Sequence, residues 1–410
     1  MPKQNLTEGF EMKEETAISL FEKYDLTRII SSSNAASMAV DLLVRQDAKR
    51  LLICMGSASA NLPDSAFISF LRAMGCWKPE MTYCDNIPAE PATEDVRRIV
   101  KQMEQNDVEY VIAIGGGSVM DAAKAAYLSY QSKKDVTELF GVNKISSVTS
   151  ASDFKRVICI PTTSGTGSEA TPYSNIVDNE SKVKKLIVEQ AIIPQWAFLS
   201  PSFTKSMPLS LTVTTALDAL VHSIESLLNN SSPDAPAEAE EWALTSISLI
   251  AENLPKAVAD GNDLQARKAL SEAAALGGMC ITHRPTSLPH LASFSLYGKV
   301  THGQAVAALL PGFWGYYIEE ESVANATMKL AGIFSGEKET DASSVIESYK
   351  NFVRSVGGAP SPGELGLDKS LIEKISSDAL LNPVKLQSSP RKINLDDASG
   401  VISGILEKAW

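Results

Sequence analysis

The 410-residue chain holds only four histidines, and three of them lie within one short stretch. These three are His283, His290 and His302, while the fourth, His222, follows Asp218 by four positions. Side chains four positions apart leave the same face of a helix. One carboxylate and a set of imidazoles suit a divalent metal such as Fe²⁺ or Zn²⁺. In the alternative interpretation, Asp218 only orients a buried histidine, and the spacing alone does not decide between the two.

Two polar, glycine-bearing loops are candidates for binding phosphate. The first, AIGGGSVMDAAKAA at 113–126, lies between an expected strand and an expected helix. Glycines let the backbone approach a ligand, and a helix N-terminus offers free N–H groups that suit a pyrophosphate. The second, PTTSGTGSEAT at 161–171, follows the next expected strand and is rich in hydroxyl groups. Together they indicate a nucleotide site at the carboxyl ends of parallel strands, although the first loop lacks the GxGxxG pattern and a generic glycine turn remains the alternative.

The residues up to about position 200 alternate short apolar strands with amphipathic helices. Beyond Pro201 the strand signal ends and long helical patterns follow. We therefore predict an α/β domain with a Rossmann-like parallel sheet at 1–200, an all-α domain at 201–410, and a cofactor site where the two meet. The expected strands are 50–56 and 80–86, and two more run into glycine loops within 108–117 and 157–167. The expected helices are 64–75, 93–107 (capped by Thr93), 208–230, 234–261 and 263–281.

Composition excludes several classes of partner. The net charge is −12 with no basic cluster, which argues against nucleic acid and anionic membranes. Five scattered cysteines without CxxC spacing are typical of free thiols in a reducing compartment. The polar N-terminus has no apolar signal region, and no apolar run reaches the roughly 18 residues of a membrane helix. We expect a cytoplasmic protein that binds neither nucleic acid nor membrane, with residues 1–25 poorly ordered.

Several motifs resemble, in order along the chain, those of the iron-containing (group III) alcohol dehydrogenases. GGGSVMDAAK matches the pattern GGGSxxDxAK, PTTSGTGSEAT matches PTTxGTGSE, ALDALVHSIE matches GMDALxHxIE, and VTHGQAVAALLP matches IPHGxAxAxLLP. IIPQWAFLSPSFTKSMP resembles the end of that family's first domain, and LNPVKLQSSPRKINLDDASGVI resembles its tail. The resemblance covers about residues 25 to 410 and implies the dehydroquinate synthase-like fold, with a metal between a dinucleotide-binding domain and a helical domain.

The resemblance also implies roles for individual residues. The metal, Fe²⁺ as first choice or Zn²⁺, would be held by Asp218, His222, His290 and His302. Because the imidazoles must be neutral to coordinate, metal affinity should fall below about pH 6. A homodimer or larger homo-oligomer is expected, as is common in the family. The cofactor, NAD(H) or NADP(H), would place its pyrophosphate on Gly116, Gly117 and Ser118, and its ribose would lie near Lys184. The groove that holds the cofactor would be lined by Asp121, Thr162, Thr163, Thr166 and Ser168.

Three features depart from the family pattern. The family usually reads HxxxHP after the third ligand, but Phe294 stands where the second histidine would be. His290 and His302 are 12 positions apart, which is closer than usual in the family. After the first strand, Gly56 and Ser57 stand where the family often has a carboxylate that repels a 2′-phosphate. We therefore predict that NADP(H) is tolerated or preferred, with Ser57 donating to that phosphate.

The stretch ITHRPTSLPHLASF is similar to the branch of the family that reduces phosphonoacetaldehyde. Arg284 would then face an anionic substrate, since a guanidinium pairs well with phosphonate or carboxylate. In the alternative, Arg284 is a surface charge at a helix end. His283 is expected to point away from the metal.

From these features we expect an oxidoreductase that transfers a hydride between NAD(P)H and a small aldehyde or primary alcohol, with a metal polarising the substrate oxygen. One alternative within the family is reduction of phosphonoacetaldehyde or another anionic aldehyde. Others are non-redox chemistry, as in dehydroquinate synthase-like relatives, and a structural role with a degraded metal site.

Overall fold

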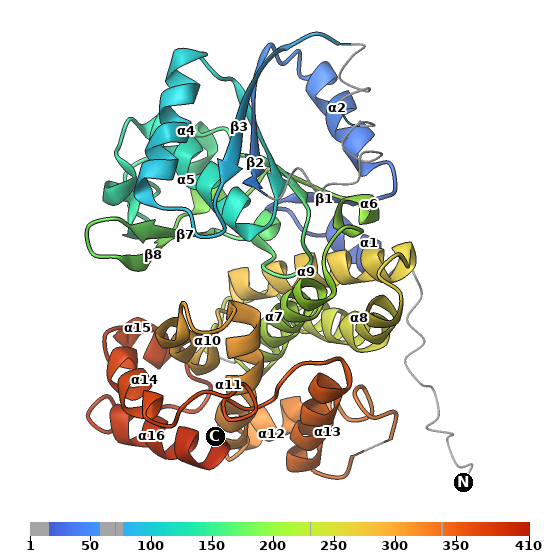
Figure 1. Cartoon of the computed structure of the whole chain (residues 1–410), viewed down its shortest axis with the longest axis vertical. Coiled ribbons are helices and arrows are strands. Elements are labelled where there is room, and N and C mark those ends of the chain that lie inside the picture. The colour runs from blue at the N-terminus through green and yellow to red at the C-terminus, as the bar shows by residue number, and fades with distance from the viewer. Residues whose placement is uncertain (1–15, 58–69, 71–76, 230, 338) are drawn as a thin grey trace.

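The computed structural model describes residues 16–57, 70, 77–229, 231–337 and 339–410. Figure 1 shows an α/β half built from the first part of the chain and a helical half built from the later part, with α7 (Leu209–Leu228) and α9 (Leu264–His283) where the halves meet. The last strand of the main sheet ends at Leu199, and the described elements from Pro201 onward are helices. The division into domains at 200/201 stays a prediction.

A six-stranded parallel sheet forms the centre of the α/β half. Its strand order is β1-β9-β6-β4-β2-β3, and neighbouring strands pair in parallel, for example with Met55 opposite Ile114 and Gly115 opposite Pro161. The runs RLLICMG and YVIAIG are rich in apolar and β-branched residues, which favours strands buried on both faces. The strands are β1 Arg28–Ser31, β2 Arg50–Gly56, β3 Glu80–Ile87, β4 Tyr110–Gly115, β6 Ile158–Pro161 and β9 Trp196–Leu199.

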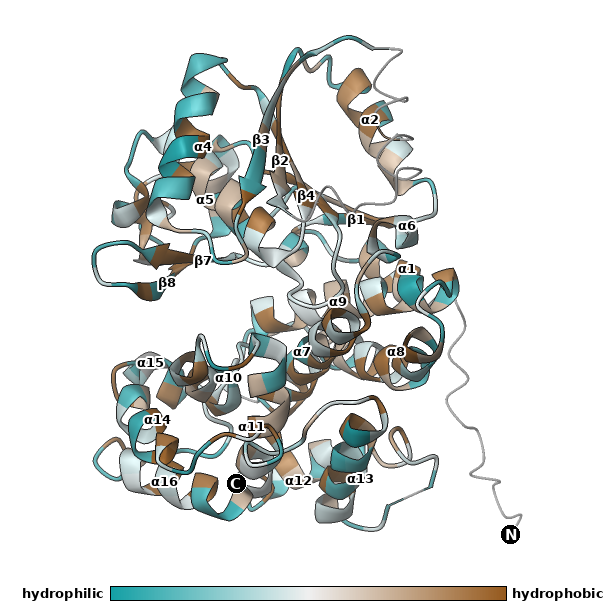
Figure 2. Ribbon diagram, viewed as in Figure 1, coloured by the Kyte–Doolittle hydropathy of each residue, from teal (hydrophilic) through white to brown (hydrophobic). Residues whose placement is uncertain are grey.

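Helices cover both faces of this sheet. Alternate residues of β2 point to opposite sides: Leu52 packs in one core with α4 (Thr93–Gln105) and α5 (Gly117–Ser132), whereas Leu51 packs in another with α2 (Ala35–Arg45). In Figure 2 the visible surface of α4 is mostly hydrophilic, as expected for an amphipathic helix whose apolar face packs on a sheet. The predicted parallel α/β sheet is therefore confirmed.

Several local predictions for the α/β half need correction. Helix α4 begins at Thr93, but its N-cap is Ala92, whose N–H donates to the Asp95 carboxylate at 3.0 Å. A three-stranded sheet, partly antiparallel, was not predicted, and the expected helix at 64–75 lies almost entirely outside the described residues. The added strands are β5 Gly141–Val142, β7 Tyr173–Asp178 and β8 Val183–Val188, in the order β5-β8-β7.

The N-terminal segment is also better ordered than expected over its second part. Residues 16–22 form helix α1 (Thr16–Glu22), and the side chains of Leu20, Phe21 and Tyr24 are buried in the core of the helical half. The expectation of poor order for residues 1–25 is therefore wrong for 16–25. The four described cysteines are buried and unpaired.

The helical half is organised around α7 (Leu209–Leu228), which packs against α8, α9 and α11. Helix α7 is long and apolar enough to cross a membrane by length and composition alone, whereas no such apolar run was expected from the sequence. In the structure, 89% of this apolar stretch is buried inside the protein. The other helices are α6 Pro201–Thr204, α8 Ala239–Ala259, α9 Leu264–His283, α10 Leu288–Ser293, α11 His302–Tyr317, α12 Glu321–Met328, α13 Ala342–Ser355, α14 Leu371–Ala379, α15 Pro383–Gln387 and α16 Ala398–Ala409.

Candidate metal centre and cofactor site

The buried helix α7 carries the first two side chains of the candidate metal centre. Asp218 and His222 leave one face of the helix, one turn apart, and both are buried. Oδ1 of Asp218 lies 3.8 Å from Nε2 of His222. A carboxylate and an imidazole are thus held together inside the protein, at the spacing that the sequence predicted.

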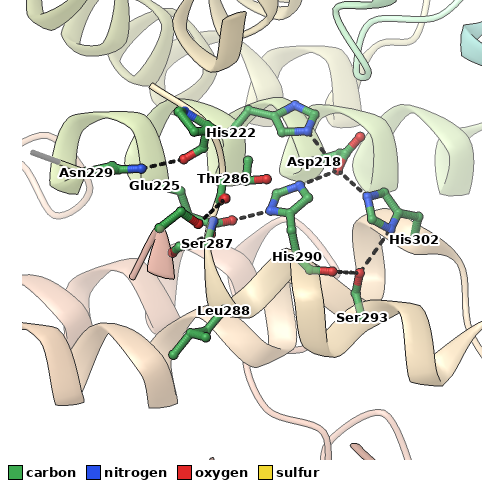
Figure 3. Close-up of polar contacts among 12 residues, drawn as sticks. Asp218, His222, Glu225, Asn229, Thr286, Ser287, Leu288, His290, Ser293 and His302 are labelled. Atoms are coloured by element: carbon green, nitrogen blue, oxygen red, sulfur yellow. Dashed lines mark hydrogen bonds and ion pairs between the residues drawn. The ribbon is translucent and has the colours of Figure 1, made fainter. Parts of the chain in front are cut away.

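His290 and His302 come from other elements and meet the same oxygen. Nε2 of His290, on α10, lies 3.8 Å from Oδ1 of Asp218, and Nε2 of His302, at the first turn of α11, lies 3.5 Å from it. Figure 3 shows the three imidazoles arranged around Asp218. His290 stacks on His222 with ring centroids 4.7 Å apart. The four residues that the sequence nominated therefore converge.

Close approach of α11 to α7 brings His302 into place. Gly303, the next residue, lies so near α7 that a Cβ there would sit 1.9 Å from the carbonyl oxygen of Thr214 and 3.4 Å from Cβ of Asp218. Only glycine leaves room for this contact. The shorter segment between His290 and His302 is thus accommodated without separating the two histidines.

Glu225 supports His290 from the side away from Asp218, and sequence reasoning missed it. Its Oε2 is hydrogen-bonded to Nδ1 of His290, while Oε1 accepts from the backbone N–H of Ser287 at 2.7 Å and from its hydroxyl at 3.0 Å (Figure 3). Such a carboxylate fixes the ring and leaves Nε2 facing the centre. The signal was present, because Glu225 lies one turn after His222 on the same helix.

The charges of the cluster suit a cation. Burial disfavours the charged form of Asp218, but the three imidazoles outweigh it and hold the pKa of this carboxyl well below its usual range. Burial lowers the pKa of His222 to about 4, so its ring is neutral at neutral pH. Burial also opposes protonation of His290, but Glu225 and Asp218 outweigh it and raise the pKa of this imidazole. Burial also lowers the pKa of His302 to about 4, so the cluster combines a carboxylate with the neutral imidazoles of His222 and His302, which can coordinate a metal.

Unsatisfied buried atoms test whether a metal fits. Oδ1 of Asp218 and Nε2 of His290 are buried without a hydrogen-bond partner among the described residues, which is rare for buried polar atoms. The ligand atoms of Asp218, His222 and His290 lie within 4.8 Å of one another. Atoms bound to one ion at about 2.1 Å each lie roughly 3 to 3.5 Å apart. A divalent cation would satisfy the orphaned atoms together, so the residues fit the group.

Three further residues that the sequence nominated in the helical half are His283, Phe294 and Arg284. His283 packs against the rings of Tyr24 and Trp242, with centroids 6.2 and 5.7 Å away, so it points away from the candidate metal ligands as expected. Phe294 is 46% exposed in the turn after α10. Arg284 is the C-cap residue of α9 and is partly exposed.

The two predicted cofactor loops contact each other at the carboxyl ends of adjacent strands. Gly117 begins helix α5, and a Cβ there would lie 2.7 Å from Cγ2 of Thr166. A Cβ at Gly116 would lie 3.1 Å from Oγ1 of Thr163. The N–H of Thr162, which is partly exposed, donates to the Gly115 carbonyl at 3.0 Å. The nominated loops therefore form one surface, at the start of a helix whose N-terminus suits a phosphate.

Asp121 and Ser168, also nominated for the groove, bind each other beneath that surface. The Ser168 hydroxyl donates to Asp121 at 2.6 Å, and the other Asp121 oxygen accepts from the N–H of Asn175 at 2.9 Å. Lys124, which sequence reasoning left unassigned, is fully buried and donates to the Ser168 carbonyl at 2.9 Å and to that of Thr171 at 3.0 Å. These contacts hold the second loop against α5.

The other nominated cofactor residues lie around the same edge. Gly56 ends β2, next to β4 in the sheet, and Ser57 follows it and is exposed. Ser118 is on the first turn of α5, and its hydroxyl donates to the Ala89 carbonyl. Lys184, on β8, has its ammonium 2.5 Å from Glu90 and 5.2 Å from the ring centre of Tyr297 in the helical half. The β7–β8 hairpin thus reaches the segment that precedes His302.

Comparison with known proteins identifies the family. A model described as iron-containing alcohol dehydrogenase matches residues 27–201, and one described as Fe-containing alcohol dehydrogenase family, C-terminal, matches residues 212–410. The chain is 31% identical to the NAD-dependent methanol dehydrogenase of Bacillus methanolicus, over 77% of this chain and 82% of that relative. The chain belongs to the iron-containing alcohol dehydrogenase family.

Two further alcohol dehydrogenases are similar to this chain over most of its length. Long-chain-alcohol dehydrogenase 1 of Geobacillus thermodenitrificans is 31% identical over 75% of this chain and 77% of its own length. The alcohol dehydrogenase from Oenococcus oeni has the same fold, with a TM-score of 0.83 at 25% identity, over 93% of this chain and 98% of that chain. The fold expected from the motifs is confirmed, and the protein is an oxidoreductase of the alcohol dehydrogenase type.

Proposed function

We propose that this protein transfers a hydride between NAD(P)H and a small aldehyde or primary alcohol, at a divalent metal held by Asp218, His222, His290 and His302. The observation that carries the proposal is the convergence of the three imidazoles on one buried carboxylate oxygen. The same convergence supports a catalytic role over a degraded metal site. The non-redox alternative would need Glu and His in place of Asp218 and His222, so the presence of these two residues favours redox chemistry.

Each part of the site has a stated task in this proposal. A divalent metal, Fe²⁺ as first choice or Zn²⁺, supplies positive charge that polarises the substrate oxygen. Glu225 keeps the ring of His290 oriented toward the centre, and the Asp218 carboxylate balances part of the charge. Gly116, Gly117 and Ser118 at the N-terminus of α5 bind the cofactor pyrophosphate. The protein thereby positions the nicotinamide and the substrate for direct transfer.

The choice of cofactor is part of the proposal. The exposed Ser57 and the adjacent Gly56 at the end of β2 offer no carboxylate to repel a 2′-phosphate. We therefore propose that NADP(H) is accepted as well as or better than NAD(H).

The test compares metal-loaded and metal-stripped protein. NADH and NADPH oxidation is followed spectrophotometrically with a panel of small aldehydes, after chelation and after reloading with Fe²⁺ or Zn²⁺. Reloading should restore turnover and bind about one ion per chain. The variant His222→Ala should lose the ion and the activity, whereas the matched control His283→Ala should keep both, because His283 packs away from the centre. Turnover that is equal with and without metal would refute the proposal.

A further inference from the structure

Lys385 contacts the segment that leads to the candidate metal ligand His290, and it has no role in the function proposed above. It belongs to the short helix α15, where its N–H donates to Oδ1 of Asn382 at 3.0 Å. Its ammonium donates to the Thr286 hydroxyl at 2.5 Å, and the hydroxyl of Ser388 donates to the Thr286 carbonyl at 3.2 Å. Backbone and side chain of Lys385 are thus both held in place.

The segment that Lys385 contacts leads directly to a metal ligand. Thr286 precedes Ser287, which donates twice to Glu225, and Glu225 in turn holds His290. Figure 3 shows Thr286 among the residues that surround the four candidate ligands. In Figure 1, α15 and α10 lie on the side of the helical half that is turned toward β7 and β8. Lys385 is therefore linked to the candidate ligand His290 through the segment of Thr286 and Ser287 and through Glu225, on the side of the helical half that faces the α/β half.

The charge of Lys385 has no counterion within the part of the chain that the structure describes. No carboxylate there forms an ion pair with its ammonium, whose one hydrogen-bond partner is the neutral hydroxyl of Thr286. Glu225 attracts it from farther away, but the oxygens of Glu225 are already bonded to His290 and Ser287. By contrast, the partly buried Lys184 pairs with Glu90.

An ammonium without a paired carboxylate can bind an anionic ligand. It carries three N–H donors, of which Thr286 takes one, so at least two remain for a ligand. Burial lowers the pKa of Lys385 to about 8, which still leaves most of the side chain protonated at neutral pH. Because the chain has a net charge of −12, its general field repels anions. A local, partly desolvated cation is what a small anionic substrate would need there.

We propose that Lys385 binds an oxyanion group of the substrate, so that the preferred aldehyde or alcohol carries a carboxylate, sulfonate or phosphonate. This inference rests on the proposed hydride transfer and names the substrate class of that site. Preference for an anionic substrate would then depend on Lys385, because its contact with Thr286 fixes the ammonium beside the segment that carries His290. Arg284, which the sequence nominated for the same task, is the competing candidate.

The test separates charge recognition from damage to the site. kcat/KM is measured for 4-oxobutanoate and for its neutral methyl ester, using metal-loaded wild type and the variants Lys385→Met, Lys385→Arg and Arg284→Met. The matched control is Lys392→Met, since Lys392 is an exposed lysine of the same segment. A parallel calorimetric titration of the NAD⁺ complex with propanoate, methanesulfonate and methylphosphonate reports binding without turnover.

We expect Lys385→Met to lower kcat/KM for the anionic aldehyde by about 10- to 100-fold, the range for a charge-assisted hydrogen bond, and to leave the ester nearly unchanged. Lys385→Arg should retain the preference, Lys392→Met should resemble wild type, and the favoured anion should bind Lys385→Met more weakly. Equal loss on both aldehydes, or loss only in Arg284→Met, would overturn the inference. If the wild type reduces no aldehyde, the proposed function fails, and the titration still decides whether Lys385 binds the anion.

Discussion

Glu225 is hydrogen-bonded to Nδ1 of His290, and this leaves Nε2 of the same ring 3.8 Å from Oδ1 of Asp218. One side of the imidazole is therefore fixed by a carboxylate that cannot reach the centre, while the other side faces it. The pair explains how a histidine on the six-residue helix α10 is held in a fixed orientation toward the candidate metal centre.

The first prediction concerns this pair. Glu225→Gln keeps the size of the side chain but removes the charge that orients His290, so metal affinity should fall by about 10- to 100-fold. The dissociation constant for Zn²⁺ is measured by competition with a chromogenic chelator. The control Glu240→Gln removes an exposed carboxylate that pairs with Lys329 on the surface, and it should bind as wild type does. Unchanged affinity in Glu225→Gln would show that His290 is positioned by packing alone.

A second prediction follows from the close approach of α11 to α7. Gly303→Ala would press a methyl group against the Thr214 carbonyl, so the start of α11, with His302, must move. Overpacking of this kind destabilises proteins by about 1–3 kcal/mol, and the displaced ligand should weaken metal binding. Gly315→Ala on the same helix is the matched control, because nothing lies within 4 Å of its added Cβ. Thermal unfolding and metal titration of both variants check this. Equal stability and equal metal affinity in Gly303→Ala and Gly315→Ala would argue against the contact.

A third prediction uses the buried Glu169, in the second cofactor loop. Burial raises its pKa to about 7, although its own backbone N–H and Lys124 oppose the shift. In the unfolded chain a glutamate titrates near pH 4.3. Because the folded protein binds this proton more tightly than the unfolded chain does, protonation of Glu169 stabilises the folded state. This contribution to the free energy of unfolding is complete below about pH 4 and is lost as the pH rises through about 7.

Glu169→Gln should therefore flatten the pH dependence of the free energy of unfolding between about pH 5 and 8, by on the order of 2 kcal/mol. Urea unfolding at a series of pH values measures this, with Glu240→Gln again as the exposed control. If the free energy of unfolding changes with pH in the same way in Glu169→Gln and in wild type, Glu169 is ionised over the whole pH range measured.

A fourth prediction concerns the cofactor. Wild type should have a kcat/KM for NADPH at least equal to that for NADH, because no carboxylate follows β2 at Gly56 and Ser57. Ser57→Asp would place a negative charge there and should lower kcat/KM for NADPH by at least about tenfold, with a smaller effect on NADH. A strong preference of the wild type for NADH would contradict this interpretation of Ser57.

The sequence predicted the parts of the site whose members follow a short, regular spacing. Asp218 and His222 share a helical face, and the glycine loops follow apolar strands, so local pattern and family motifs were enough to nominate them. The order of α1 escaped prediction because the polar, charged residues before it outweighed its own apolar positions, of which Leu20 and Phe21 are buried against distant helices. Lys385 escaped because its contact with Thr286 joins residues 99 positions apart, and no local pattern reports such a pairing.

The central claim is that this protein moves a hydride between a nicotinamide and a small carbonyl compound at a metal held by Asp218 and the three histidines. Its most direct test supplies NADPH and NADH deuterated at C4 to the metal-loaded protein with a small aldehyde, and locates the label by NMR. We predict that deuterium appears on C1 of the alcohol, that it does so only with metal bound, and that His222→Ala abolishes the transfer while His283→Ala does not. Absence of label in the alcohol from the loaded protein, or equal transfer without metal, would contradict the account.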